Sequence, residues 1–267
     1  MSKRIQLYSL GFLVLVMLGE GYLYYKSVRF QKEPVPVAVD GAEIRKEEVT
    51  GAGDVLDGDK DLSDEEEIIP DDLSEKELPA ELNLKAVFYS QAPFANWDLP
   101  WQEACEEASV LLVANEYFGH NWSRSEFNDE ILKLVDWQID RFGDYEHTSV
   151  DQTAEILTDY LGLKTVIHEN PTYEDVQRVL ARGNFIVMTF AGKKLGNPNY
   201  RNGGPVYHAI LVKGYKEGQK IITHDVGTRN GEDYVYSWSV VENALHDYAV
   251  PIESGAKRMI EVLPPAF

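Results

Sequence analysis

The chain has 267 residues, 44% of them apolar or aromatic, which is enough for one sizeable core but not for two full domains. Its formal net charge is −20, and residues 33–82 hold 18 Asp and Glu against 4 Lys and Arg, so the remainder carries only about −6. Because phosphate binding needs clustered Lys and Arg, this acidity excludes a nucleic-acid partner.

Residues 1–30 predict a membrane anchor or signal segment. Lys3 and Arg4 precede a largely apolar run from Ile5 to Tyr25, about the 20 residues that cross a bilayer as a helix. The short basic end should stay in the cytoplasm, which places the remaining chain outside the cell membrane. No clear small-x-small cleavage site follows the run, and this favours a single-pass anchor. A cleaved signal peptide, which would give a secreted protein, and a buried soluble helix stay open as alternatives.

Residues 31–82 predict a disordered acidic linker, because they hold too few apolar side chains to offset the entropy of the chain. Asp57, Asp59 and Asp61 have the D-x-D-x-D spacing of a calcium loop. Leu62 and Ile68 stand where that loop needs glycine and glutamate. A solvated charge run is therefore the favoured interpretation, with calcium binding as the alternative.

From residue 83 to residue 267 the pattern is that of one folded domain. Helices are expected over residues 101–119, 123–143, 148–162, 172–183 and 239–248, and strands over 163–169, 184–190, 231–238 and 256–263. A further pair of strands, residues 204–227, turns at Glu217 and Gly218. Helices come first and an antiparallel sheet follows, so we expect an α+β fold with a helical half packed on a sheet half.

Cys105 is the only cysteine of the chain and falls in the first turn of the first expected helix. In an exported protein such a thiol is a packed core residue, an intermolecular bridge or a nucleophile. Free N–H groups and the helix dipole lower the pKa of a thiol at this position. Glu106 and Glu107 follow it, and their charges favour the helix start but oppose thiolate formation.

The strand pair supplies a partner for this thiol. With the turn at Glu217 and Gly218, paired residue numbers sum to about 435, which sets His208 opposite Gly227. Asp225 is then a diagonal neighbour on the same face, close enough for its carboxylate to accept the Nδ1–H of His208. A register slip of one residue would undo this pairing. A histidine oriented by an acid is one half of a nucleophilic site.

An acyl-transfer site also needs donors for the developing oxyanion. The backbone N–H of Cys105 is one candidate. The amide of Gln91, in the loop "YSQAPFANW", is the preferred second donor, and Gln102 is the next choice.

The order of these residues resembles the papain-clan cysteine peptidases. "YSQAPFANW…EACEEAS", "YHAILVKGY" and "THDVGTRNGEDYVYS" are similar to the branch that processes bacteriocin leaders, cysteine-peptidase family thirty-nine, over residues 85–263. The resemblance implies a papain-like fold with Cys105 as nucleophile, His208 as general base and acid, Asp225 as its orienter and Gln91 in the oxyanion hole. Many members have Gly-Pro after the cysteine, whereas this chain has Glu106 and Glu107.

We therefore expect an extracytoplasmic cysteine peptidase that acts on a peptide or protein and needs no cofactor or metal. A cell-wall amidase or transpeptidase with the same three residues is one alternative. An inactive surface-binding module, with Cys105 out of reach of His208, is another. The Gly- and Asn-rich loop 192–204 leads into the His208 strand and is either a mobile rim of the cleft or a plain solvated connection.

Overall fold

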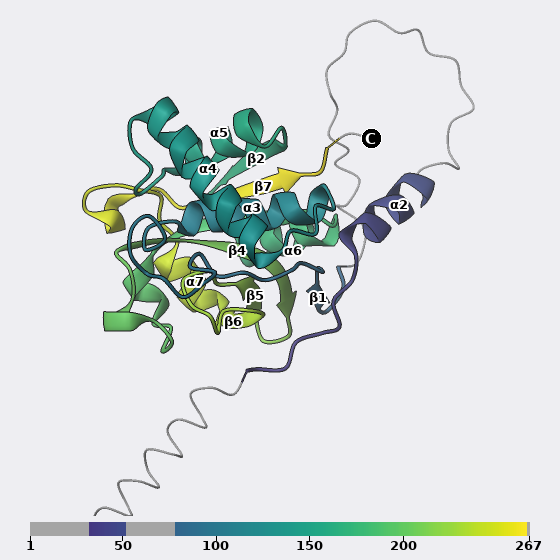
Figure 1. Cartoon of the computed structure of the whole chain (residues 1–267). Helices are drawn as coiled ribbons and strands as arrows, with labels where there is room; N and C mark the ends of the chain where they lie inside the picture. The colour runs from purple at the N-terminus through teal and green to yellow at the C-terminus, as the bar shows by residue number, and fades with distance from the viewer. Residues whose placement is uncertain (1–31, 52–77, 266–267) are drawn as a thin grey trace, which may run out of the picture. The chain divides into compact units, whose positions relative to one another are not determined.

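An antiparallel sheet runs through the part of the chain described by this computed structural model, residues 32–51 and 78–265 (Figure 1). Its strands, in chain order, are β1 (Leu82–Asn83), β2 (Lys164–Glu169), β3 (Phe185–Ala191), β4 (Tyr207–Lys216), β5 (Lys220–His224), β6 (Tyr234–Ser237) and β7 (Arg258–Leu263). They lie in the order β2-β7-β3-β4-β5-β6, and β1 pairs with the end of β4. The long β4 thereby connects the centre of the sheet to the N-terminal part of the domain.

The helices are α2 (Gly41–Gly51), α3 (Cys105–Tyr117), α4 (Arg124–Phe142), α5 (Val150–Glu155), α6 (Tyr173–Ala181) and α7 (Trp238–Ala244). Capping boxes begin α4, α5 and α6, with Ser123, Ser149 and Thr172 as the capping residues. Gly143 ends α4 in the left-handed conformation that glycine adopts without strain. These local signals explain why the expected helices and strands agree with the observed ones to within a few residues.

The helical half packs on the sheet through α3, which lies against β4 and α4 (Figure 1). Nearly every residue of α3 is buried, on all sides of the helix. A helix surrounded by protein needs no polar face, and its apolar core runs through Val110–Val113. The predicted α+β class, with a helical half packed on an antiparallel sheet, is confirmed.

The hairpin formed by β4 and β5 follows the predicted register at the end nearest the site. Leu211 pairs with His224 and Val212 with Thr223, so paired numbers sum to 435 as expected. Beyond Lys213 the register shifts by one residue. The Lys213 side chain is buried there and donates to Asn83 Oδ1 at 2.6 Å and to Asp233 Oδ1 at 2.8 Å. The bulge thus lies where β1 joins β4. Between the bulge and the turn the paired numbers sum to 436, so the predicted register is wrong there, and it holds near the site because the bulge removes the one-residue offset.

The segment expected to be a disordered linker, residues 31–82, is ordered in part. It contains the helix α2, and the N–H of Val39 donates to the Asn83 carbonyl at 2.8 Å. The N–H of Lys85 donates to the Val39 carbonyl at 2.7 Å, and the Arg45 guanidinium donates to the Gly183 carbonyl. The predicted boundary at residue 83 therefore falls inside β1. Composition averaged over the whole acidic segment conceals a short stretch whose order comes from contacts with distant residues.

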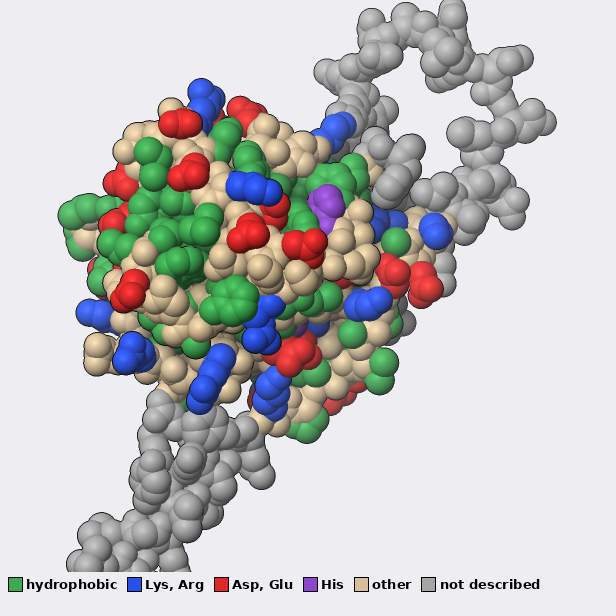
Figure 2. Space-filling model, viewed as in Figure 1, with side chains coloured by type: hydrophobic (Ala, Val, Ile, Leu, Met, Phe, Trp, Pro, Cys, Tyr) green, Lys and Arg blue, Asp and Glu red, His purple; other side chains and the backbone are tan. Residues whose placement is uncertain are grey.

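The predicted membrane segment, residues 1–30, and the Asp57–Asp61 repeat lie outside the described residues. Across residues 32–51 and 78–265, the helices are all too short or too polar to cross a bilayer. On the face shown in Figure 2, Lys and Arg side chains lie among acidic and apolar ones.

Candidate active site

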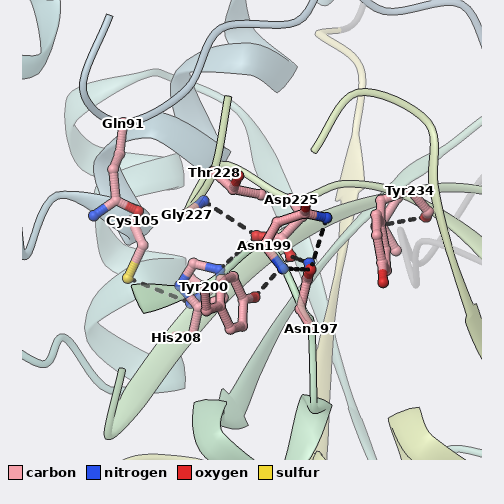
Figure 3. Close-up of polar contacts among 12 residues, drawn as sticks. Gln91, Cys105, Asn197, Asn199, Tyr200, His208, Asp225, Gly227, Thr228 and Tyr234 are labelled. Carbon is pink, nitrogen blue, oxygen red and sulfur yellow. Dashed lines mark hydrogen bonds and ion pairs between the residues drawn. The ribbon is translucent and has the colours of Figure 1, made fainter. Parts of the chain in front are cut away.

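The thiol of Cys105 lies beside the strand that carries the predicted histidine. Cys105 is the first residue of α3, and its Sγ accepts a hydrogen bond from the N–H of Ala209 at 3.4 Å. His208 precedes Ala209 on β4 (Figure 3). The thiol itself donates to Glu106 Oε2 at 2.8 Å. The fold therefore brings together a cysteine and a histidine that are about a hundred residues apart in the chain.

His208 and Asp225 are in direct contact, with 2.9 Å between His208 Nε2 and Asp225 Oδ1. Sequence reasoning assigned this hydrogen bond to Nδ1, and that detail is wrong. Gly227 leaves room for the ring in this position, because a Cβ there would come within 2.7 Å of Cε1 and 2.9 Å of Nε2. Nδ1 is thus the ring nitrogen left for proton exchange with a nucleophile.

Five donors surround the carboxylate of Asp225 (Figure 3). Oδ1 accepts from His208 and from the N–H of Gly227 at 3.1 Å. Oδ2 accepts from Asn197 Nδ2 at 2.8 Å, from the Tyr200 hydroxyl at 2.7 Å and from the Tyr236 hydroxyl at 2.6 Å. Burial alone would raise the pKa of Asp225, but the hydrogen bonds from His208, Tyr236 and Tyr200 bring it below its usual value. Asp225 is thereby held as an anion that fixes the ring of His208.

Three of these donors were not found from the sequence. Asn197 and Tyr200 belong to the loop 192–204, and both side chains are buried against Asp225 rather than solvated. Tyr236 comes from β6, which pairs with β5 next to the site. The only local signal was the alternation of "YVYS", which sets Tyr234 and Tyr236 on the same face of the strand. The anchoring role of the loop has no short-range signature.

Gln91 lies in the expected loop, but its amide nitrogen donates to backbone carbonyls and is not left free for an oxyanion. Its Nε2 donates to the backbone carbonyls of Trp101 and Gln102, each at 2.9 Å. Both amide hydrogens are therefore used to hold the turn that precedes α3, and an oxyanion would have to displace one of these acceptors. The side chain of Gln102 is directed to Glu103 Oε1. As the first residue of α3, Cys105 has a backbone N–H without an intrahelical acceptor, and this N–H is the donor best placed for an oxyanion.

The two glutamates after Cys105 are fully enclosed, with exposed fractions of 1% for Glu106 and 0% for Glu107. Burial, together with the charge and hydrogen bond of Glu106, raises the pKa of the Cys105 thiol well above its usual range. Burial raises the pKa of Glu106 to about 7, although the hydrogen bond from the thiol partly opposes it. The pKa of Glu107 is raised by burial and by the charge of Glu106. The expectation that the helix start lowers the pKa of the thiol is therefore wrong, because burial and a carboxylate outweigh it.

A pocket of about 310 Å³ lies beside the start of β4. It is lined by His147, Ala191, Lys193, Lys194, Val206 and residues 248–253. Val206 lies two residues before His208, and a Cβ on Gly192 would be 3.1 Å from the Cβ of His208. Its lining does not include Cys105, His208 or Asp225, so it is a separate concave surface at this end of β4.

Comparisons with known proteins identify a family and three solved structures with similarity to this chain. The model of the peptidase C39-like family matches residues 84–249. No curated protein matches the chain. Among solved structures, a candidate C39-like peptidase from Bacillus anthracis is 14% identical with a TM-score of 0.46, covering 70% of this chain and 99% of the other.

Two further solved structures are more distant. UfSP from C. elegans is 14% identical with a TM-score of 0.35, covering 72% of this chain and 36% of UfSP. The avirulence protein AvrPphB of Pseudomonas is 10% identical with a TM-score of 0.27, covering 61% of this chain and 92% of AvrPphB.

Proposed function

The chain belongs to the peptidase C39-like family, and from this premise we propose that it is a cysteine peptidase that uses Cys105, His208 and Asp225. The observation that carries the proposal is the arrangement at the start of β4. Nε2 of His208 is fixed on Asp225 at 2.9 Å, and the next residue, Ala209, donates its N–H to the sulfur of Cys105. The thiol, the imidazole and the orienting carboxylate are thus arranged in space in the order that nucleophilic acyl transfer requires.

The reaction proceeds in two halves. The S–H bond of Cys105 breaks, its proton passes to His208 Nδ1, and the electron pair on Sγ forms a bond to the carbonyl carbon of the peptide. The carbonyl oxygen becomes an oxyanion, which the backbone N–H of Cys105 stabilises. The C–N bond then breaks as His208 returns the proton to the leaving amine. Water, deprotonated by His208, attacks the thioester and releases the acid and the thiol.

Labelling by a peptide electrophile that reacts with thiols tests this proposal. We expect the electrophile to label the full chain at Cys105, its only cysteine. The labelled chain should no longer hydrolyse the peptide from which the electrophile is derived. His208→Ala should lower the labelling rate by a factor of about 10³, because the thiol loses its base. Cys105→Ala should show no labelling at all. Equal labelling of the wild type and of Cys105→Ala would contradict the assignment of the nucleophile.

One observation favours a second candidate, an inactive binding module. The thiol is hydrogen-bonded to Glu106, and burial holds its pKa high. A chain of this kind would bind peptides without cleaving them. The same labelling experiment separates the two functions, because an inactive module would leave Cys105 unmodified across the pH range.

The location of the activity is proposed from residues 1–30 alone. The apolar run after Lys3 and Arg4 supports a single-pass anchor with the peptidase domain outside the cell membrane, where its substrate would be an extracytoplasmic peptide or protein. Protease added to intact spheroplasts should digest the domain and leave a short membrane-bound fragment. A domain protected until the membrane is lysed would contradict this orientation.

A further inference from the structure

Glu106 contacts the reacting atom of the proposed nucleophile. The thiol of Cys105 donates to Glu106 Oε2 across 2.8 Å, and the two side chains are 5% and 1% exposed. Within residues 78–265 no hydrogen bond joins this thiol to His208; the imidazole bonds Asp225 instead. The proton that must leave the sulfur is therefore directed at a carboxylate and not at the general base.

The groups that face Glu106 come from three elements. They are Cys105 and Glu107 of α3, Tyr207 and His208 of β4, and the backbone of Thr148 in the loop before α5. Of these, only His208 can carry a positive charge. An ionised Glu106 is thus a buried anion whose main compensation is the thiol proton, the backbone N–H groups of Glu106 and Thr148, and a protonated His208.

Building on the proposed peptidase function, we propose that Glu106 is a further catalytic residue that sets the protonation state of the nucleophile. As a carboxylate it accepts the hydrogen of the thiol and holds Cys105 neutral. As a carboxylic acid it becomes a donor to the thiolate and stabilises the reactive form.

The proton balance gives the direction of the effect. With Glu106 protonated, the S–H bond breaks, the proton moves to His208 Nδ1, the electron pair stays on Sγ, and the O–H of Glu106 donates to the sulfur. When Glu106 loses its proton, a thiolate would be a second anion beside a buried carboxylate, so the proton stays on the sulfur. Because burial raises the pKa of Glu106 to about 7, this suppression of the thiolate begins as the pH rises through neutrality.

Glu107 offers a matched control. It is the next residue of the same helix and is equally buried, but its Oε1 accepts from Gln138 Nε2 and not from the thiol. A general effect of removing a buried carboxylate from α3 should appear in both substitutions. An effect on the sulfur by direct contact should appear only at Glu106.

The test is the rate at which iodoacetamide alkylates Cys105 in the full chain, measured from about pH 5 to about pH 9. Because the chain has one cysteine, alkylation reports on this thiol alone. We expect the wild-type rate to rise with pH less steeply than that of Glu106→Gln once Glu106 ionises, near pH 7. Glu106→Gln should therefore react about tenfold faster than the wild type at pH 8, whereas Glu107→Gln should keep the wild-type profile.

A Glu106→Gln variant that reacts more slowly than the wild type at every pH, or with the same profile, would overturn the inference. If that variant does not fold, the infrared S–H band of the unsubstituted chain, with Cys105→Ala as the blank, tests the same contact. The frequency of the band should fall as the pH rises through neutrality, because the thiol then donates to an ionised carboxylate, and a constant frequency would overturn the proposal. Neither measurement needs a substrate. A chain with the expected profile that cleaves no peptide refutes the peptidase proposal alone, and a peptidase whose profile is the same in Glu106→Gln refutes only the role of Glu106.

Discussion

Two buried glutamate sites in this domain have opposite surroundings. Glu261 of β7 is 3% exposed and accepts from His168 at 2.8 Å, from Asn184 at 2.7 Å and from the Arg182 guanidinium at 2.8 and 2.9 Å. Burial alone would raise its pKa, but the hydrogen bond from His168 and the charge of Arg182 bring it to about 2. Glu106 is 1% exposed, contacts a thiol, and has a pKa raised to about 7.

The difference shows that burial alone does not decide whether the pKa of a carboxyl group is raised or lowered, because its hydrogen-bond and charge partners do. Glu261 has a guanidinium and two further donors, so its ionised form stabilises the fold. Glu106 and Glu107 have no basic side chain among their hydrogen-bond partners in the described part of the chain, so ionisation costs stability. The unfavourable pair lies next to the proposed nucleophile, as expected where protonation equilibria are part of the chemistry.

The largest effect is expected from Glu261→Gln. The folded-state pKa of Glu261, about 2, is below its ordinary value of 4.5, so its contribution is full above pH 4.5 and is lost as the pH falls toward 2. The substitution should lower the free energy of unfolding by about 3 kcal/mol at pH 7, and this difference should shrink on acidification. Urea unfolding at several pH values measures it. Glu174→Gln, which removes an exposed ion pair with Arg178, should change stability by less than about 0.5 kcal/mol.

Glu106→Gln should change the free energy of unfolding in the opposite direction to Glu261→Gln. Because the folded-state pKa of Glu106, about 7, lies above its ordinary value of 4.5, ionisation costs stability progressively from pH 4.5 to pH 7 and fully above that. The variant should be more stable than the wild type by about 2 kcal/mol at pH 8 and nearly equal to it at pH 4.5. Urea unfolding at these two pH values checks the sign. A variant less stable than the wild type at pH 8 would show that the carboxylate has a partner that compensates its charge.

The fold class and the chain order of the site residues could be predicted from the sequence, because both depend on short-range patterns. The period of each segment predicted its helix or strand. The turn at Glu217 and Gly218 predicted a register that selects Asp225 over His224, and the pairs nearest the site have that register. The pairs nearest the turn are offset from it by one residue, and the bulge at Lys213 corrects the offset before the site, a compensation that the sequence did not predict.

What the sequence did not contain depends on how distant segments approach one another. Which ring nitrogen of His208 contacts Asp225 depends on the orientation of the side chain, which strand pairing alone does not predict. The amide of Gln91 donates to backbone carbonyls of the turn before α3 and not to an oxyanion, and the spacing of residues in the sequence does not predict these acceptors. The burial of Glu106 is equally hidden, because a charged residue in the first turn of a helix is normally solvated.

Asp225 extends the comparison to a carboxylate that has neutral donors besides His208. Tyr236→Phe removes one of its five donors, so the pKa of Asp225 should rise and its ionised form should be lost at a higher pH on acidification. We expect a loss of about 1 kcal/mol in the free energy of unfolding at pH 7. The acidic limb of the activity profile should also move to higher pH. Tyr234→Phe is the matched control, because Tyr234 lies on the same strand but makes no hydrogen bond to Asp225 through its hydroxyl. Identical profiles for the two variants would show that the hydroxyl of Tyr236 only fills space, and that the other four donors hold Asp225 as an anion.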